Sequence, residues 1–254
     1  MNYFSSSSVA SGYAKHRPYF HPIVVNRIRE CLHLESKISC ALDVGCGAGL
    51  STIALLPLAE KVVGIDSSAE MVEAAIPNEH VRYLTCPAEK LAFPSASFQI
   101  VTVCGALNWI NRAEFFPAAR RVLGSEGWVV IYDNVFRGTM QGHSGFGAWY
   151  AEQFLSRYPK PPRDERPITT AECSEFGFSF AHSEVYTNEV SYSLGQFVEY
   201  LLTLTNLSVP LAQSLETEAS AREWLRGGLG RFFNGEPKTL EYGGYIWYLQ
   251  CIGP

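Results

Sequence analysis

One short segment restricts this chain more than any other: three glycines at alternate positions, between an apolar run and a helix-like run. The segment reads LDVGCGAGL over residues 42–50. Glycines let the backbone turn tightly with positive φ and let a ligand approach where a Cβ would be in the way. In a doubly wound α/β fold, the turn between a buried strand and the following helix is where the ligand binds. The alternative is a turn that only joins a strand to a helix.

Apolar runs of strand length alternate with helix-like segments around this turn. Such alternation is typical of a mostly parallel sheet with helices on both faces. The fold class predicted is therefore α/β, Rossmann-like and doubly wound. The expected strands are Cys40–Val44, Lys61–Ile65, Val81–Leu84, Phe98–Cys104 and Trp128–Tyr132, and the expected helices are Tyr19–Leu34, Leu50–Leu58, Ala69–Ile76 and Ala113–Leu123.

The pattern changes after Tyr132. Glycines and prolines interrupt Arg137–Thr170, which predicts an irregular insertion without a regular strand and with one helix near Ala148–Arg157. A strand at the C-terminus is expected to close the sheet in antiparallel fashion. The remaining predicted elements are a helix at Thr170–Phe176, a strand at His182–Tyr192, helices at Leu194–Leu204 and Val209–Arg226, and a last strand at Gly244–Ile252.

Composition excludes several classes of protein. The chain has 254 residues, 47% of them hydrophobic, and a net charge of -5, which disfavours nucleic acid and anionic membrane surfaces as partners. Its seven cysteines form no C-x-x-C pair, so disulfide frameworks and zinc sites are not expected. No apolar stretch reaches the roughly 18 residues of a membrane span, and the first residues lack the pattern of a signal peptide. We therefore expect a cytoplasmic protein.

The spacing of the glycines separates two classes of ligand. A dinucleotide turn needs G-x-G-x-x-G to seat a pyrophosphate, whereas Leu50 stands at the third glycine position here, and Asp43 would repel a pyrophosphate. Asp66 ends the next predicted strand, 21 residues beyond Gly45, where a carboxylate can accept both hydroxyls of a ribose. These features favour a nucleoside without a diphosphate and disfavour a nicotinamide oxidoreductase.

Together with further segments, this pattern resembles the class I S-adenosylmethionine-dependent methyltransferases over roughly residues 13–134. The further segments are 91–99, 106–109, 120–123 and 127–130. Within that superfamily the chain is similar to the small-molecule branch that contains the trans-aconitate methyltransferases. Tyr13-Ala14-x-x-Arg17-Pro18 resembles the N-terminal lid segment of that branch.

The resemblance implies S-adenosylmethionine as methyl donor and S-adenosylhomocysteine as product. It also implies one domain, 1–254, divided into a lid and helix (1–38), a donor-binding core (39–134) and a region with the insertion, acceptor-side helices and last strands (135–254). Oligomeric state is left as monomer or homodimer. The donor-binding residues that it implies are Tyr13, Arg17, Asp43, Gly45, Cys46, Gly47, Asp66, Ser67, Met71, Ala88, Glu89 and Gly105.

Two positions depart from the family pattern. Pro87 stands where an Asp usually accepts the amino group of adenine, so Glu89 or a backbone carbonyl would have to replace it. Asn108 stands where the related branch commonly has His before Trp109, and an amide cannot act as a general base. These departures keep open the alternative that the chain binds the donor without catalysing methyl transfer.

The acceptor is expected at the carboxyl ends of the strands, beside Gly105–Trp109. Asn108, Trp109 and His143 are the candidate catalytic residues, and Trp149 and Tyr150 are further lining candidates. Trp109 and His143 could instead be a core aromatic and a solvated loop residue. The cluster of Lys160, Arg163 and Arg166 is interpreted as a solvated loop, with anion recognition as the alternative.

We therefore expect methyl transfer to a small-molecule acceptor, on an oxygen of a carboxylate or hydroxyl. Displacement at a sulfonium has a good leaving group, so alignment and exclusion of water can supply most of the acceleration. The alternatives are a C- or N-methyltransferase of a natural product or lipid-like substrate, and a non-catalytic donor-binding regulator.

Overall fold

Two compact units make up the chain, of which the computed structural model describes residues 15–253. Among the described residues, the sheet unit comprises 19–134, 163–185 and 244–253. The helical unit comprises 15–18, 135–162 and 186–243. Each unit has a hydrophobic core of its own.

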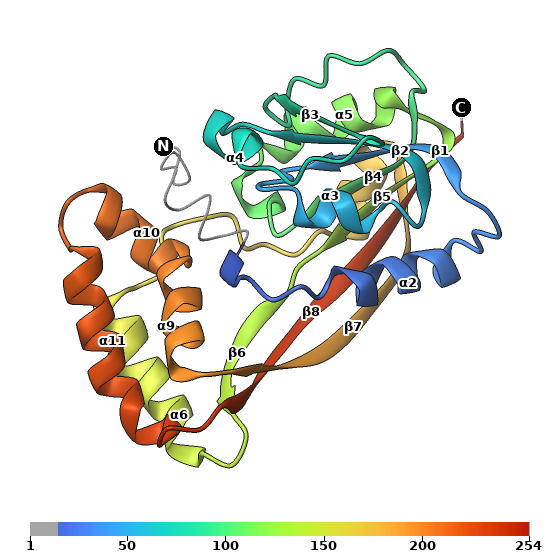
Figure 1. Ribbon diagram of the computed structural model, residues 1–254. Helices are drawn as coiled ribbons and strands as arrows, with labels where there is room; N and C mark the ends of the chain where they lie inside the picture. Colours follow the sequence, from blue (N-terminus) through green and yellow to red (C-terminus); the bar gives the residue numbers. More distant parts are fainter. Residues whose placement is uncertain (1–14, 254) are drawn as a thin grey trace. The chain divides into compact units, whose positions relative to one another are not determined.

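The sheet unit contains five parallel strands in the order β3-β2-β1-β4-β5 (Figure 1). The later part of β8 pairs antiparallel with β5, and β7 pairs with β8. The predicted fold class, a mostly parallel doubly wound sheet with an antiparallel last strand, is confirmed. The strands are β1 (Ile38–Val44), β2 (Ala59–Asp66), β3 (Val81–Thr85), β4 (Phe98–Cys104), β5 (Leu123–Tyr132), β7 (Phe178–Tyr192) and β8 (Lys238–Cys251).

The helices of the sheet unit include two that end earlier than their apolar patterns suggest. The pattern predicted a helix to Leu58, but α3 stops after Ala54, since Pro57 disfavours helical geometry at the residue before it. Pro77 acts similarly after α4. The helical segments are α2 (His21–Cys31), α3 (Leu50–Ala54), α4 (Ala69–Glu73), η1 (Leu107–Trp109), α5 (Arg112–Val122) and α8 (Thr170–Glu175).

The core of the sheet unit explains why its strands are apolar on both faces. Val44 on β1, Val101 on β4 and Val129 on β5 are fully buried. Phe115 and Phe116 of α5 are also fully buried and join the same cluster. Burial of such side chains stabilises the unit by roughly 1.5–3 kcal/mol each. This core leaves polar residues to the ends of the strands, where the candidate site lies.

The helical unit is built around buried aromatic side chains. Phe146, Trp149, Phe197, Tyr200 and Phe233 are among them, each at most 2% exposed. Its elements are β6 (Val135–Met140), α6 (Ser144–Trp149), η2 (Tyr150–Phe154), α7 (Leu155–Arg157), α9 (Leu194–Leu202), α10 (Thr205–Ala212) and α11 (Glu218–Phe233) (Figure 1).

Two expectations for this unit were wrong. Residues after Arg137 were predicted to hold no regular strand, but β6 pairs antiparallel with the first part of β8, from Val135↔Gly243 onward. Gly138, which argued against a strand, has φ +74° and lies where the register shifts, so it accommodates an irregularity in β6. The predicted helix Val209–Arg226 is two helices, α10 and α11, separated by a turn in which Ser214 has φ +56°.

Within residues 15–253, every helix is too short or too polar to cross a membrane.

Candidate functional site

The glycine-rich turn predicted from sequence joins β1 to α3 at the carboxyl end of the sheet. Gly45, Gly47 and Gly49 all have positive φ, at +70°, +51° and +86°. A Cβ on Gly45 would lie 2.4 Å from the Cβ of Ala106, and one on Gly49 would lie 2.3 Å from the hydroxyl of Tyr83. Backbone conformation and close neighbours therefore both require glycine at Gly45 and Gly49. We call residues 43–52 the donor turn.

Asp66 ties the donor turn to the end of β2. Its carboxylate accepts hydrogen bonds from the backbone N–H groups of Gly47 and Ser68, both at 2.9 Å. Burial raises the pKa of this carboxyl group, although backbone N–H donors oppose the shift. A carboxylate has about four lone-pair positions, more than the backbone N–H groups of Gly47, Ser67 and Ser68 occupy. The half-buried side chain can therefore still accept a hydrogen bond from a ligand hydroxyl.

Asp43, the first residue of the donor turn, is fully buried. Its carboxylate accepts hydrogen bonds from the hydroxyls of Ser51 (2.6 Å), Thr52 (2.7 Å) and Thr102 (2.8 Å). Burial raises the pKa of Asp43, and these hydrogen bonds act in the opposite direction. The carboxylate holds β1, α3 and β4 together around the turn. Its predicted part in donor binding stays a prediction, with three hydroxyls already bound to the side chain.

The side expected to hold adenine follows β2 and β3. Ser67 is exposed, whereas Met71 is only 2% exposed and donates its backbone N–H to the Oγ of Ser68, the N-cap of α4. Ala88 and Glu89 are half-buried after β3. Oε1 of Glu89 accepts the backbone N–H of Asn111 at 2.9 Å. This carboxylate thus caps the N-terminus of α5, which competes with the adenine contact suggested for it.

The carboxyl end of β4 carries the acceptor-side candidates. Gly105, with φ +59°, approaches Asp133: a Cβ there would lie 3.2 Å from Oδ1 of Asp133. Asn108 and Trp109 follow in the short turn η1. The Oδ1 atom of Asn108 is buried and has no hydrogen-bond partner among the described residues. Buried polar atoms are rarely left unpaired, so this oxygen is a candidate acceptor for an N–H or O–H of a ligand.

A segment near the end of the predicted insertion, residues 163–168, lies against η1. The backbone N–H of Asp164 donates to the carbonyl oxygen of Asn108 at 3.1 Å. The guanidinium carbon of Arg163 lies 5.9 Å from the centre of the Trp109 ring. We call residues 163–168 the strap. Its contacts place it beside the two acceptor-side candidates of the sheet unit.

Arg112, at the start of α5, fastens the strap and was missed by the sequence analysis. It is only 6% exposed and donates to the carbonyl oxygen of Arg166. Its guanidinium also pairs with the carboxylates of Asp164 (3.7 Å) and Glu172 (3.4 Å). No motif marks an arginine whose partners lie more than 50 positions away. Only its place in the first turn of a helix, where a cation is unfavourable, hints at a specific role.

The other predicted residues belong to the helical unit or lie outside the description. Arg17 donates to the carbonyl oxygen of Thr203 at 3.1 Å. His143 is half-buried, with its ring 6.3 Å from that of Phe232. Trp149 is a core residue at 1% exposure. Tyr13 lies outside the described residues, and the parts of Arg17, His143 and Tyr150 in donor or acceptor binding stay predictions.

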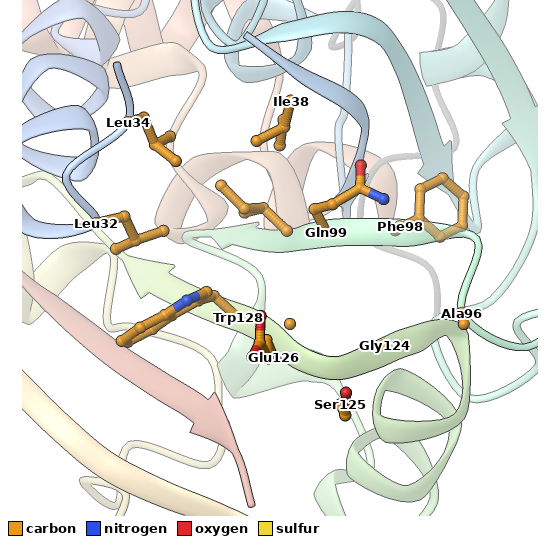
Figure 2. A pocket seen from close by; sticks show the side chains of 12 residues that line it. Leu32, Leu34, Ile38, Ala96, Phe98, Gln99, Gly124, Ser125, Glu126 and Trp128 are labelled. Carbon is orange, nitrogen blue, oxygen red and sulfur yellow. The ribbon is translucent and has the colours of Figure 1, made fainter. Parts of the chain in front are cut away.

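A cavity of about 360 Å³ lies in the sheet unit away from the donor turn (Figure 2). Ile38, Phe98 and Gly124 in its wall stand at or near the amino ends of β1, β4 and β5, whereas the donor turn follows the carboxyl end of β1. Ligands of doubly wound sheets bind outside the carboxyl ends of the strands. The donor turn and its neighbours are therefore the candidate site.

The residues present fit S-adenosylmethionine. Gly45 and Gly47 allow the backbone to approach the methionine part of the donor, and Asp66 has lone pairs left for a ribose. Within residues 15–253, no cluster of three or more His, Cys, Asp or Glu side chains could hold a metal ion. The fold and this turn resemble the class I methyltransferase architecture.

Comparisons with known proteins agree with that class. Residues 42–131 match the family described as a methyltransferase domain. A candidate methyltransferase of Dictyostelium discoideum is 30% identical over 125 residues, which are 49% of this chain and 47% of that protein. The ubiquinone biosynthesis O-methyltransferase of Brucella ovis is 26% identical over 145 residues, 55% of this chain and 58% of that protein. The chain thus spans about half the length of the curated relatives it matches.

A solved structure supports the fold over nearly the whole chain. A candidate type II methyltransferase from Anaeromyxobacter dehalogenans has a TM-score of 0.73 at 19% identity, with 94% of this chain and 99% of that chain covered. The domain match and the relatives show that part of this chain is similar to methyltransferases, and the solved structure shows the same fold. They do not select the trans-aconitate branch.

Proposed function

We propose that this protein transfers the methyl group of S-adenosylmethionine to an oxygen of a small molecule, a carboxylate or a hydroxyl. The observation that carries the proposal is the donor turn, with its three left-handed glycines and the Asp66 carboxylate bound to Gly47. When bound there, the donor supplies an activated methyl group. The protein's own residues then have to bind, orient and exclude water.

The acceptor side supports an oxygen that needs little help from a base. Asn108 can accept a hydrogen bond through its unpaired Oδ1 but cannot take up a proton at neutral pH. Trp109, half-buried in the same turn, offers an apolar wall that excludes water. An acceptor that is already anionic, or a hydroxyl oriented by Asn108, suits these two side chains.

Calorimetric titration tests the donor half of the proposal. The protein is titrated with S-adenosylmethionine and S-adenosylhomocysteine, with NAD as the control ligand. We expect micromolar binding of both sulfur nucleosides and no binding of NAD. Asp66→Ala should weaken binding by about 1–3 kcal/mol, because two ribose hydroxyls lose their acceptor. Unchanged affinity in a folded variant would remove Asp66 from the site.

A turnover assay tests the acceptor half of the proposal. The protein is incubated with donor labelled in the methyl group and with small carboxylic acids, phenols and amines, and methylated products are identified by mass spectrometry. Label on a carboxylate or hydroxyl oxygen supports the proposal, whereas label on carbon or nitrogen contradicts the choice of atom. Donor binding without any transfer would favour the non-catalytic regulator.

A further inference from the structure

Arg163 is a cation of the strap that lies beside the acceptor-side candidates of the sheet unit. Its side chain is 18% exposed, although it belongs to a segment with the composition of a solvated loop. Its guanidinium carbon lies 5.9 Å from the centre of the Trp109 ring. An arginine over an aromatic face is attracted by the ring without using its N–H groups, which remain able to donate. The contact with Trp109 therefore occupies none of the N–H donors of Arg163.

The hydrogen bond that Arg163 makes leaves its two terminal nitrogens available. Its Nε donates to Oε1 of Glu165 at 2.8 Å, and its two terminal nitrogens make no hydrogen bond with any residue from 15 to 253. Glu165 has a side chain 58% exposed, so water screens its attraction for Arg163. A ligand carboxylate or phosphate could add two charge-assisted hydrogen bonds at the terminal nitrogens while Glu165 keeps Nε.

The neighbouring charges of the strap are already paired among themselves. Asp164 lies between Arg112 and Arg166, at 3.7 Å and 2.7 Å. Glu172 pairs with Arg112 at 3.4 Å. Arg166 uses Nε and one terminal nitrogen on Asp164, whereas both terminal nitrogens of Arg163 are available. The Asp164 N–H bond to the carbonyl oxygen of Asn108 fixes the strap beside the unpaired Oδ1 of that residue.

We propose that Arg163 binds an anionic group, a carboxylate or a phosphate, on the methyl acceptor, while Oδ1 of Asn108 receives an N–H or O–H of the same molecule. The inference rests on the proposed function, because it assigns the acceptor of that same site. Arg112 is a positioning residue in this arrangement: it holds the strap and touches no ligand.

Calorimetry on protein saturated with S-adenosylhomocysteine tests the assignment. The probes are succinate, benzoate and phenyl phosphate, each compared with an uncharged partner: succinamide, benzamide and phenol. We expect at least one anion to bind and its uncharged partner to bind at least tenfold more weakly. Binding by the carboxylates alone or by phenyl phosphate alone identifies which anion the acceptor carries.

Three variants link that binding to Arg163. Arg163→Gln removes the charge and should weaken the bound anion by about tenfold to a hundredfold, as expected for losing a pair of charge-assisted hydrogen bonds. Arg163→Lys keeps the charge without the fork and should restore part of the affinity. Arg166→Gln is the matched control: it removes a charge from the same strap at an arginine 77% exposed, and should change affinity by less than about twofold.

The outcomes separate the two proposals. Loss of S-adenosylhomocysteine binding in the unaltered protein contradicts the proposed function itself. Normal S-adenosylhomocysteine binding contradicts the Arg163 assignment in any of three cases: no anion binds, the uncharged partners bind as well as the anions, or Arg163→Gln matches Arg166→Gln. S-adenosylhomocysteine affinity should be the same in all three variants, which also shows that they fold.

Discussion

The donor turn and the strap both belong to the sheet unit, but they are held in different ways. The donor turn depends on glycine conformations, backbone N–H groups and hydroxyls bound to Asp43 and Asp66. The strap depends on charged side chains, chiefly the buried guanidinium of Arg112. A turn held by steric needs tolerates few residues at each position, whereas ion pairs can be made by many pairs of positions. The donor turn can therefore be predicted from a sequence, whereas the strap cannot.

The largest expected effect tests whether the donor turn is sterically determined. Gly45→Ala places a non-glycine residue at φ +70° and a methyl group 2.4 Å from the Cβ of Ala106. We expect the free energy of unfolding to fall by about 3 kcal/mol, from left-handed strain and overpacking together. Urea unfolding measures the loss, and S-adenosylhomocysteine affinity should fall with it.

Two variants control this prediction. Gly124→Ala adds a methyl group to a strand glycine with nothing within 4 Å, so its unfolding free energy should change little. Adding Ala106→Gly to Gly45→Ala removes the colliding methyl and should recover the packing part of the loss, but not the strain. A double variant as unstable as Gly45→Ala would show that Ala106 plays no part.

A second change tests whether ion pairs hold the strap. Arg112→Met keeps much of the apolar stem but leaves the carboxylates of Asp164 and Glu172 without their shared guanidinium. We expect a loss of about 2 kcal/mol, less than for a fully buried pair, because these carboxylates are partly exposed and Asp164 keeps Arg166. Faster hydrogen exchange at the N–H of Asp164 should accompany it.

The comparison variant for Arg112 is Arg82→Met, which alters an exposed arginine on β3. It should leave both the unfolding free energy and the exchange of Asp164 unchanged. If Arg112→Met exchanged no faster at Asp164 than Arg82→Met, the strap would be held by its backbone bond to Asn108 and by Arg166, and not by Arg112.

The sequence predicts the donor turn and its neighbouring strands better than it predicts the strap. The first four strands were placed within two residues, because each is a short, largely apolar run between helical or turn segments. The donor turn was located because only glycine fits at Gly45 and Gly49. Strand β6 was missed, since a glycine at an irregular position resembles a loop in a single sequence. Arg112 was missed because its partners are set by tertiary packing.

Asn108 contacts the strap and lies two residues beyond Ala106, the neighbour of Gly45 in the donor turn, so it tests whether the two regions serve one reaction. Its side-chain oxygen is unpaired in this structure, and its backbone oxygen accepts the N–H of Asp164. Asn108→Ala should lower turnover by about tenfold and leave S-adenosylhomocysteine affinity nearly unchanged, if the amide orients the acceptor. Single-turnover kinetics beside calorimetry separate the two quantities. Equal losses in both would move Asn108 to the donor side.

The smallest expected effects are two pH dependences of opposite sign. Burial raises the pKa of Asp43, whereas the Arg166 side chain and backbone N–H, with Arg112 beyond them, lower the pKa of Asp164. A raised pKa gives stability that is present below the unfolded-state value and is lost as pH rises through the folded-state value. A lowered pKa gives stability that is present above the unfolded-state value, about 3.9, and is lost as pH falls.

Asp43→Asn and Asp164→Asn reveal these signs, since an amide does not titrate. The unfolding free energy of the parent protein minus that of Asp43→Asn should decrease as pH rises from about 4, because burying the ionised carboxylate becomes the cost that the variant avoids. The same difference for Asp164→Asn should decrease as pH falls below about 4, because protonation removes the attraction to Arg166 and Arg112. Urea unfolding across this range measures both slopes. Slopes of the same sign would mean that one of the two carboxylates does not lie in the electrostatic environment described. The variant whose slope is unexpected then identifies which region, the donor turn or the strap, has to be revised.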